Sequence, residues 1–130
     1  MSDELAGKKI LLVDDDQDIL TAIKAALADT GASLLTASDG DTAVSKVGSE
    51  SPDLVVLDMM LPKRSGFLVM ERLKQTTPAD QMPRVIMITG NEGTRHRVYA
   101  ESLGVDLYLK KPFRMEKLVG GIQELLTATD

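Results

Sequence analysis

The sequence contains no cysteine and no tryptophan, and it has only two Tyr and two Phe in 130 residues. The absence of cysteine excludes disulfides, thiolate metal sites and cysteine nucleophiles. So few aromatic rings argue against a stacking platform for single-stranded nucleic acid. Because 20 acidic side chains outnumber 15 basic ones, the formal net charge is −5, which gives no surplus of positive charge to hold a phosphate backbone. We therefore expect protein partners and no direct contact with nucleic acid.

Long apolar runs and a targeting signal are missing too. No continuous apolar run exceeds four residues, whereas about 20 are needed to cross a membrane. Residues 1–9 are polar and of mixed charge, unlike a signal peptide. We expect a cytoplasmic protein without membrane insertion.

Short apolar runs alternate with amphipathic segments along the chain. Continuous runs such as Ile10–Val13 are typical of strands buried on both faces of a parallel sheet. The expected strands are 10–13, 33–37, 54–57, 85–88 and 105–109, and the expected helices lie near 19–27, 42–47, 67–74, 94–103 and 115–126. Gly120 and Gly121 fall inside the last helix, and the sequence leaves open whether they serve close packing or local softness.

Five alternating strands and helices predict an α/β fold, a (βα)5 doubly wound parallel sheet. Right-handed crossovers and short connections favour the flavodoxin-like strand order 2-1-3-4-5. We expect one domain over residues 1–130, with a core over about 8–127 and no output domain, since few residues follow the last helix.

Polar residues follow four of the expected strands. Asp14 and Asp15 follow the first, Asp58 the third, Thr89 the fourth and Lys111 the fifth. Ligands of open parallel sheets bind outside the carboxyl ends of the strands, so these residues should converge. Packed carboxylates repel one another, and a divalent cation relieves that repulsion. Oxygen ligands favour Mg²⁺, with Mn²⁺ as a substitute, and Mg²⁺ in turn invites a phosphoryl group. Asp58, on the central strand, is the predicted nucleophile.

Four segments resemble the receiver domains of two-component response regulators, similar to the chemotaxis regulator. They are Ile10–Asp15, Pro52–Pro62, Ile88–Gly90 and Lys111–Phe113. The resemblance covers nearly the whole chain and implies a phosphorylation-activated signalling switch rather than an enzyme. It implies that a sensor histidine kinase or a histidine phosphotransfer protein phosphorylates Asp58.

The resemblance also implies the metal ligands. Asp15 would bind Mg²⁺ directly and Asp14 through water, together with Asp58 and the backbone carbonyl of Met60. Met60 and Asn91, each two residues beyond a site residue, match positions that tune the phosphoryl lifetime. Because a methionine side chain cannot orient water by hydrogen bonds, we hypothesise slow self-dephosphorylation.

Further roles implied by the resemblance concern the switch. Thr89 would move to the phosphoryl group, Lys111 would pair with it, and the Lys111–Pro112 peptide bond would be cis. Tyr108 matches an aromatic switch position, although an edge-strand tyrosine is also commonly structural. The fourth helix, fifth strand and fifth helix would form the face that binds a downstream target.

Several polar residues have simpler interpretations. Asp16 and Asp39 are predicted to cap helices, Lys110 to be exposed, and His96 with its two arginine neighbours to be a solvated helix surface.

Three rival functions remain. An aspartyl-phosphate phosphatase or transferase usually has a second Asp where this chain has Met60. A flavin or nucleotide carrier needs a phosphate-cradling loop where acids stand here. A pseudo-receiver scaffold normally has a broken site, and this one is complete.

Overall fold

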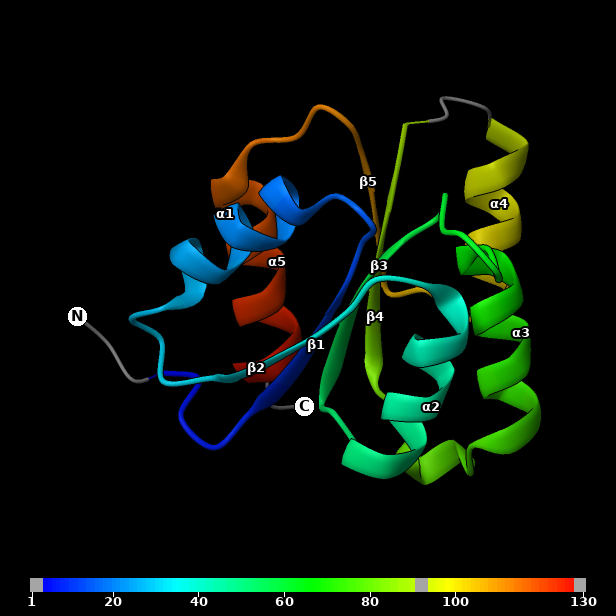
Figure 1. Ribbon diagram of the computed structural model, residues 1–130, viewed down its shortest axis with the longest axis horizontal. Helices are drawn as coiled ribbons and strands as arrows, with labels where there is room; N and C mark the ends of the chain where they lie inside the picture. Colours follow the sequence, from blue (N-terminus) through cyan, green and yellow to red (C-terminus); the bar gives the residue numbers. More distant parts are fainter. Residues whose placement is uncertain (1–3, 91–93, 128–130) are drawn as a thin grey trace.

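Five parallel strands form the central sheet of the computed structural model, which describes residues 4–90 and 94–127. The strands are β1 (Lys9–Val13), β2 (Ser33–Ala37), β3 (Leu54–Asp58), β4 (Arg84–Thr89) and β5 (Leu107–Lys110). They pair in the order β2-β1-β3-β4-β5 (Figure 1). The predicted α/β class and strand order are therefore confirmed.

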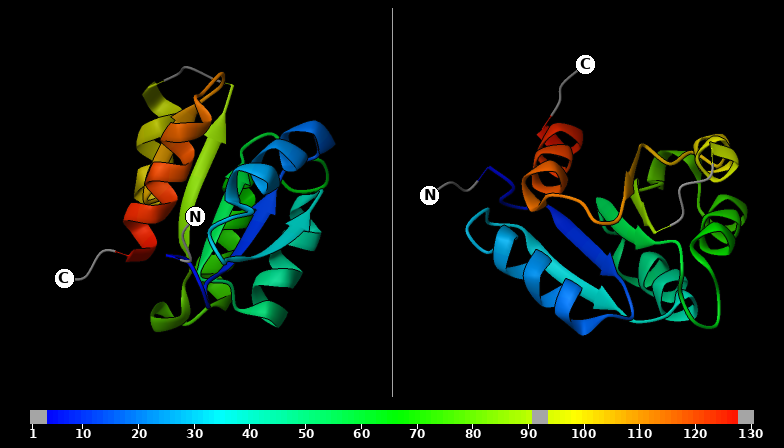
Figure 2. Two further views of the ribbon diagram at one scale, coloured as in Figure 1. Left: turned by 90° about the vertical axis from the view of Figure 1, so that its left-hand side faces the viewer. Right: turned by 90° about the horizontal axis from the view of Figure 1, so that it is seen from above.

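Helices cover both faces of the sheet (Figure 2). They are α1 (Gln17–Leu27), α2 (Gly40–Glu50), α3 (Gly66–Thr76), the short 3-10 helix η1 (Ala79–Gln81), α4 (Thr94–Ser102) and α5 (Met115–Thr127). Alternate strand residues point to opposite faces, so one apolar cluster lies under α1 and α5 and the other under α2, α3 and α4. The sheet is therefore buried between two apolar clusters.

Most expected boundaries differ from the structure by one or two residues, and the helix expected at 42–47 and the strand expected at 105–109 show why. The helix expected at 42–47 runs over Gly40–Glu50, because Asp39 caps it and its last turn is exposed and carries no apolar residue to reveal it. The strand expected at 105–109 is Leu107–Lys110. Val105 is buried, but its N–H donates to the carbonyl of Ala100 and closes α4 instead. The expected strand began too early because Val105 is apolar and buried without belonging to the sheet.

Carboxylates cap the first two helices as predicted. Asp16 accepts hydrogen bonds from the N–H groups of Asp18 and Ile19 at the start of α1. Asp39 accepts hydrogen bonds from the N–H and the hydroxyl of Thr42 in α2, and these two bonds lower the pKa of the Asp39 carboxyl group. Such caps satisfy N–H groups that the helix itself leaves unpaired.

Aromatic contacts join α4 to α3. The ring of Phe67 stacks on His96, with centroids 5.8 Å apart, and meets Tyr99 edge to face at 5.1 Å. The Tyr99 hydroxyl donates to the carboxylate of Glu71, which raises the pKa of Tyr99. The prediction of a solvated His96 is wrong, because the ring is half-buried and its Nδ1 is enclosed. The flanking arginines are exposed, as predicted.

Gly120 and Gly121 in α5 occupy different environments. A Cβ at Gly121 would lie 2.5 Å from Cδ2 of Leu107, whereas one at Gly120 would meet nothing within 4 Å. Since glycine costs a helix interior about 1 kcal/mol relative to alanine, we expect Gly120→Ala to raise the free energy of unfolding by about 0.5–1 kcal/mol. Gly121→Ala should gain less, because Leu107 must shift at a cost of about 0.5–1.5 kcal/mol. Urea denaturation measures both variants, and equal gains would contradict the close packing at Gly121.

Candidate functional site

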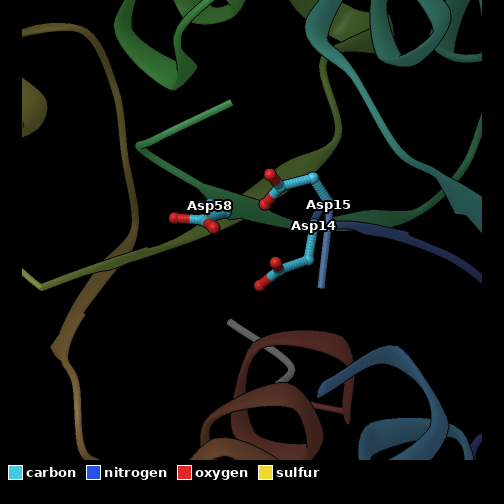
Figure 3. Close-up of side chains that lie close together, drawn as sticks. All are labelled: Asp14, Asp15 and Asp58. Carbon is cyan, nitrogen blue, oxygen red and sulfur yellow. The ribbon is translucent and has the colours of Figure 1, made fainter. Parts of the chain in front are cut away.

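Three carboxylates meet where β1 and β3 end. Asp58 is the last residue of β3, and Asp14 and Asp15 directly follow β1. The pairing of Val13 with Leu57 brings these strand ends level. One carboxylate oxygen of each aspartate lies within 4.8 Å of the others (Figure 3). Asp14 and Asp58 are buried and Asp15 is exposed. The sequence-predicted acidic cluster therefore exists and opens to solvent on the side of Asp15.

Lys111 supplies the positive charge of this cluster. Its Nζ lies 3.4 Å from Oδ2 of Asp58 and 3.6 Å from Oδ2 of Asp14. The second oxygen of each buried carboxylate accepts a backbone N–H from two residues onward. The N–H of Asp16 donates to Oδ1 of Asp14 at 2.9 Å, and that of Met60 to Oδ1 of Asp58 at 3.1 Å. Backbone hydrogen bonds to Oδ1 thus hold both carboxylates in place and leave Oδ2 of each facing Lys111.

The charge of Asp14 is poorly compensated. The pKa of this carboxyl group is raised to about 6, chiefly by burial and also by the neighbouring Asp58, although the Asp16 N–H and Lys111 lower it. One ammonium facing two buried carboxylates leaves an excess of negative charge. A proton or a cation can remove that excess. The cluster is therefore suited to hold a metal ion.

Replacing Asp14 by Asn should change how stability depends on pH in a chelator. The folded pKa of about 6 exceeds the ordinary value of 3.8, so the folded state binds more protons between about pH 4 and 6, and stability falls as the pH rises through that window. Asp14→Asn removes this fall and should add about 1–3 kcal/mol at pH 7. Urea denaturation from pH 4 to 7 measures the effect. Asp15→Asn, at an exposed position, is the control, and identical pH profiles for the wild type and Asp14→Asn would refute the prediction.

Thr89 and Tyr108 lie on the strands beyond Asp58. Thr89 ends β4 and is fully buried, and its hydroxyl donates to Sδ of Met59 at 3.5 Å. Its carbonyl accepts the N–H of Lys111 at 2.7 Å, and the following Lys111–Pro112 bond is cis. Tyr108, in β5, is half-buried, and its hydroxyl is enclosed with no hydrogen-bond partner among residues 4–90 and 94–127. Thr89 thus contacts the apolar cluster under α2, α3 and α4 through Met59, and Tyr108 packs against the same cluster.

Two of the remaining predicted positions lie at the surface, and a third lies outside the described residues. The side chain of Met60 is 66% exposed, and Lys110 is exposed as predicted. Asn91 lies outside the described residues. Sequence reasoning missed Met59 and the tight loop at Gly66, where a Cβ would come within 2.8 Å of the carbonyl oxygen of Asp58 and Cα of Met59. The glycine before a predicted helix was the available signal for the loop. Met59 gave none, because it reads as one more apolar residue.

The helices of the described residues include none that is both long and apolar enough to span a membrane. This finding agrees with the short apolar runs of the sequence.

Comparisons with known proteins agree with this geometry. Residues 10–123 match the family model described as the response regulator receiver domain. The transcriptional regulatory protein PhoP of alkaline phosphatase synthesis, from Bacillus subtilis strain 168, is 37% identical over 124 residues, which cover 95% of this chain and 50% of the relative. The chain thus spans about half the length of this curated relative.

Solved structures show the same likeness. A CheY-like receiver domain from Methanospirillum hungatei JF-1 is 30% identical, with a TM-score of 0.84, covering 92% of this chain and 94% of that one. The BeF3-activated N-terminal receiver domain of Klebsiella pneumoniae RstA is 25% identical, with a TM-score of 0.82, covering 93% and 100%. Fold, acidic cluster and matched residues agree, and the chain belongs to the response regulator receiver domain family, the phosphorylation-activated switches of two-component systems.

Proposed function

We propose that Asp58 accepts the phosphoryl group that activates this receiver domain. The observation that carries the proposal is its position: a buried carboxylate at the end of the central strand, with Asp14 beside it and the Lys111 ammonium 3.4 Å from Oδ2. A buried nucleophile that already faces a positive charge needs little rearrangement to receive a phosphoryl group. Asp15, exposed at the mouth of the cluster, lies where an incoming donor meets it.

The transfer is a displacement at phosphorus. A carboxylate oxygen of Asp58 forms the new P–O bond as the P–N bond of a phosphohistidine breaks, and the imidazole leaves with the bonding pair and takes up a proton. Mg²⁺, held by Asp14, Asp15, Asp58 and the carbonyl of Met60, would neutralise charge on the phosphoryl oxygens. Lys111 faces those oxygens as a second positive charge.

The contacts available to the phosphoryl group are large enough to operate a switch. Phosphorylation adds three acceptor oxygens and about −1.5 to −2 charge. A hydrogen bond to a charged group contributes about 1.5–3 kcal/mol, and inverting a population from 1:99 to 99:1 needs about 5.5 kcal/mol. Bonds from Thr89 and Lys111, with the cation, reach that size. Thr89 and Tyr108 would transmit the change to the face of α4, β5 and α5.

The partners we propose are a histidine kinase or phosphotransfer protein and a downstream protein target. The relatives named above are response regulators, and the PhoP relative is a transcriptional regulatory protein twice as long as the matched region. The net charge of −5 supports a protein target for this domain rather than nucleic acid. The cytoplasm, where histidine kinases act, is the proposed location.

Slow loss of the phosphoryl group is part of the proposal. The exposed Met60 side chain offers no hydrogen bond to an attacking water. We expect Met60→Asn to accelerate hydrolysis of the acyl phosphate about two- to tenfold, the effect of one added hydrogen bond of about 0.5–1.5 kcal/mol. The decay is followed by intact mass after removal of the donor, with Met60→Leu as the control. Equal decay of all three proteins would contradict this explanation.

One experiment tests the proposed function directly. The protein is incubated with a small phosphodonor in the presence of Mg²⁺ or a chelator, and its intact mass is measured. We expect one added phosphoryl group with Mg²⁺, stable in acid and labile in base as an acyl phosphate is, and little without the metal. No adduct in either condition would overturn the proposal.

A further inference from the structure

Met59 follows Asp58 in the chain, and its sulfur contacts the buried hydroxyl of Thr89. Its side chain is 4% exposed, and it packs in the apolar cluster beneath α2, α3 and α4. Its Sδ accepts the hydrogen bond from Oγ1 of Thr89 at 3.5 Å. A thioether is a weak acceptor, so this bond is one that Thr89 can exchange for a stronger one.

The backbones of both residues are fixed by neighbouring strands and loops. The Met59 N–H donates to the carbonyl of Ile88 at 2.8 Å, and its own carbonyl accepts the N–H of Gly66 at 2.9 Å. A Cβ at Gly66 would lie 2.8 Å from Cα of Met59, so the loop closes tightly over this residue. The Thr89 carbonyl is bound by the N–H of Lys111 at 2.7 Å. The contact between hydroxyl and sulfur is therefore controlled mainly by side-chain torsions.

We propose that Met59 is a positioning residue whose thioether holds the Thr89 hydroxyl in the resting state of the switch. This inference rests on the proposed phosphorylation of Asp58. A phosphoryl oxygen is a charged acceptor and binds a hydroxyl much more strongly than a thioether does. The sulfur thus keeps the hydroxyl directed into the apolar cluster until the phosphoryl group arrives, and gives it up at small cost. Met59 sets the resting population of the switch without contacting the phosphoryl group.

Met59→Leu tests the proposal, because it removes the sulfur while nearly conserving volume. In the resting protein, NMR of ¹³C-methyl-labelled threonine reads the Thr89 χ1 rotamer, and we expect Met59→Leu to alter its populations. With one resting-state partner lost, binding of beryllium fluoride in the presence of Mg²⁺, a phosphoryl analogue, should tighten about two- to fivefold, the effect of a weak hydrogen bond. Met70→Leu, a buried methionine of the same cluster on α3, is the matched control and should leave both readouts unchanged.

A double-mutant cycle separates positioning from packing. In a Thr89→Val background no hydroxyl remains to be held, so Met59→Leu should no longer change beryllium fluoride affinity. An unchanged Thr89 rotamer in Met59→Leu, or the same affinity change with and without the hydroxyl, would overturn the inference and leave phosphorylation of Asp58 intact. If the wild type instead binds beryllium fluoride no better than Asp58→Asn does, the proposed function fails, and the rotamer measurement still decides whether Met59 holds Thr89.

Discussion

Asp58→Asn is expected to abolish phosphoryl uptake completely, whereas Asp15→Asn should only slow it. An amide is not a nucleophile for phosphorus, and Asp58 is the carboxylate of the cluster that combines burial, a place on the central strand and the shortest contact to the Lys111 ammonium. Asp14 is buried as well, but it follows β1 rather than the central strand and lies 3.6 Å from the same Nζ. Asp15 is exposed and forms no ion pair with Lys111 within the described part of the chain, which suits a metal ligand. Intact mass after incubation with Mg²⁺ and a small phosphodonor compares the three proteins.

The Asp58→Asn variant should fold normally, so a missing adduct can be attributed to chemistry. The amide oxygen of Asn can still accept the N–H of Met60 that now binds Oδ1 at 3.1 Å. Removing one of two buried carboxylates also relieves their mutual repulsion. Circular dichroism and a urea titration check the fold. If Asp58→Asn gave the same yield of adduct as the wild type, the nucleophile would lie elsewhere, and Asp14 would be the next residue to replace.

The sequence contains enough to predict the site because strand ends of a parallel sheet converge. Buried runs locate the strands within one or two residues, and the polar residue after each run marks its carboxyl end. Asp58 and Thr89 prove to be the last residues of β3 and β4, and their pairing through Ile88 and Lys110 brings Lys111 to the same edge. The convergence of these side chains follows from topology and needs no knowledge of side-chain packing.

Contacts between helices could not be predicted in the same way. The stacking of His96 on Phe67 depends on the angle at which α4 lies beside α3. The apolar periodicity of the two segments does not predict that angle. The link between Met59 and Thr89 depends on which of several buried methionines ends beside the hydroxyl. Composition shows that such residues fill the core, and only their coordinates show which of them contact a functional group.

Mg²⁺ should stabilise the protein strongly against unfolding. Asp15→Asn should weaken this stabilisation and, because Asp15 is exposed, should disturb the fold less than replacing either buried aspartate of the cluster. Three carboxylates within 4.8 Å, two of them buried, gain from a cation that the Lys111 ammonium replaces only in part. At a concentration one hundred times its dissociation constant, Mg²⁺ adds about 2.7 kcal/mol to the free energy of unfolding. Loss of one charged ligand should lower Mg²⁺ affinity at least about tenfold, or about 1.4 kcal/mol. Titration of Mg²⁺ into thermal unfolding experiments, with a chelator as the zero point, measures both quantities.

The control for this prediction is Asp18→Asn, which removes an exposed carboxylate in the first turn of α1, outside the cluster. It changes the net charge by the same amount as Asp15→Asn, so any general electrostatic effect on cation binding appears in both variants. A tenfold loss of Mg²⁺ affinity in Asp15→Asn but not in Asp18→Asn would assign the metal to the cluster. Equal losses in both variants would show that Mg²⁺ is only attracted diffusely by an acidic surface. If the loss is confined to Asp15→Asn, this variant also separates metal binding from phosphoryl transfer, since it weakens the first and leaves the nucleophile, Lys111 and Thr89 in place.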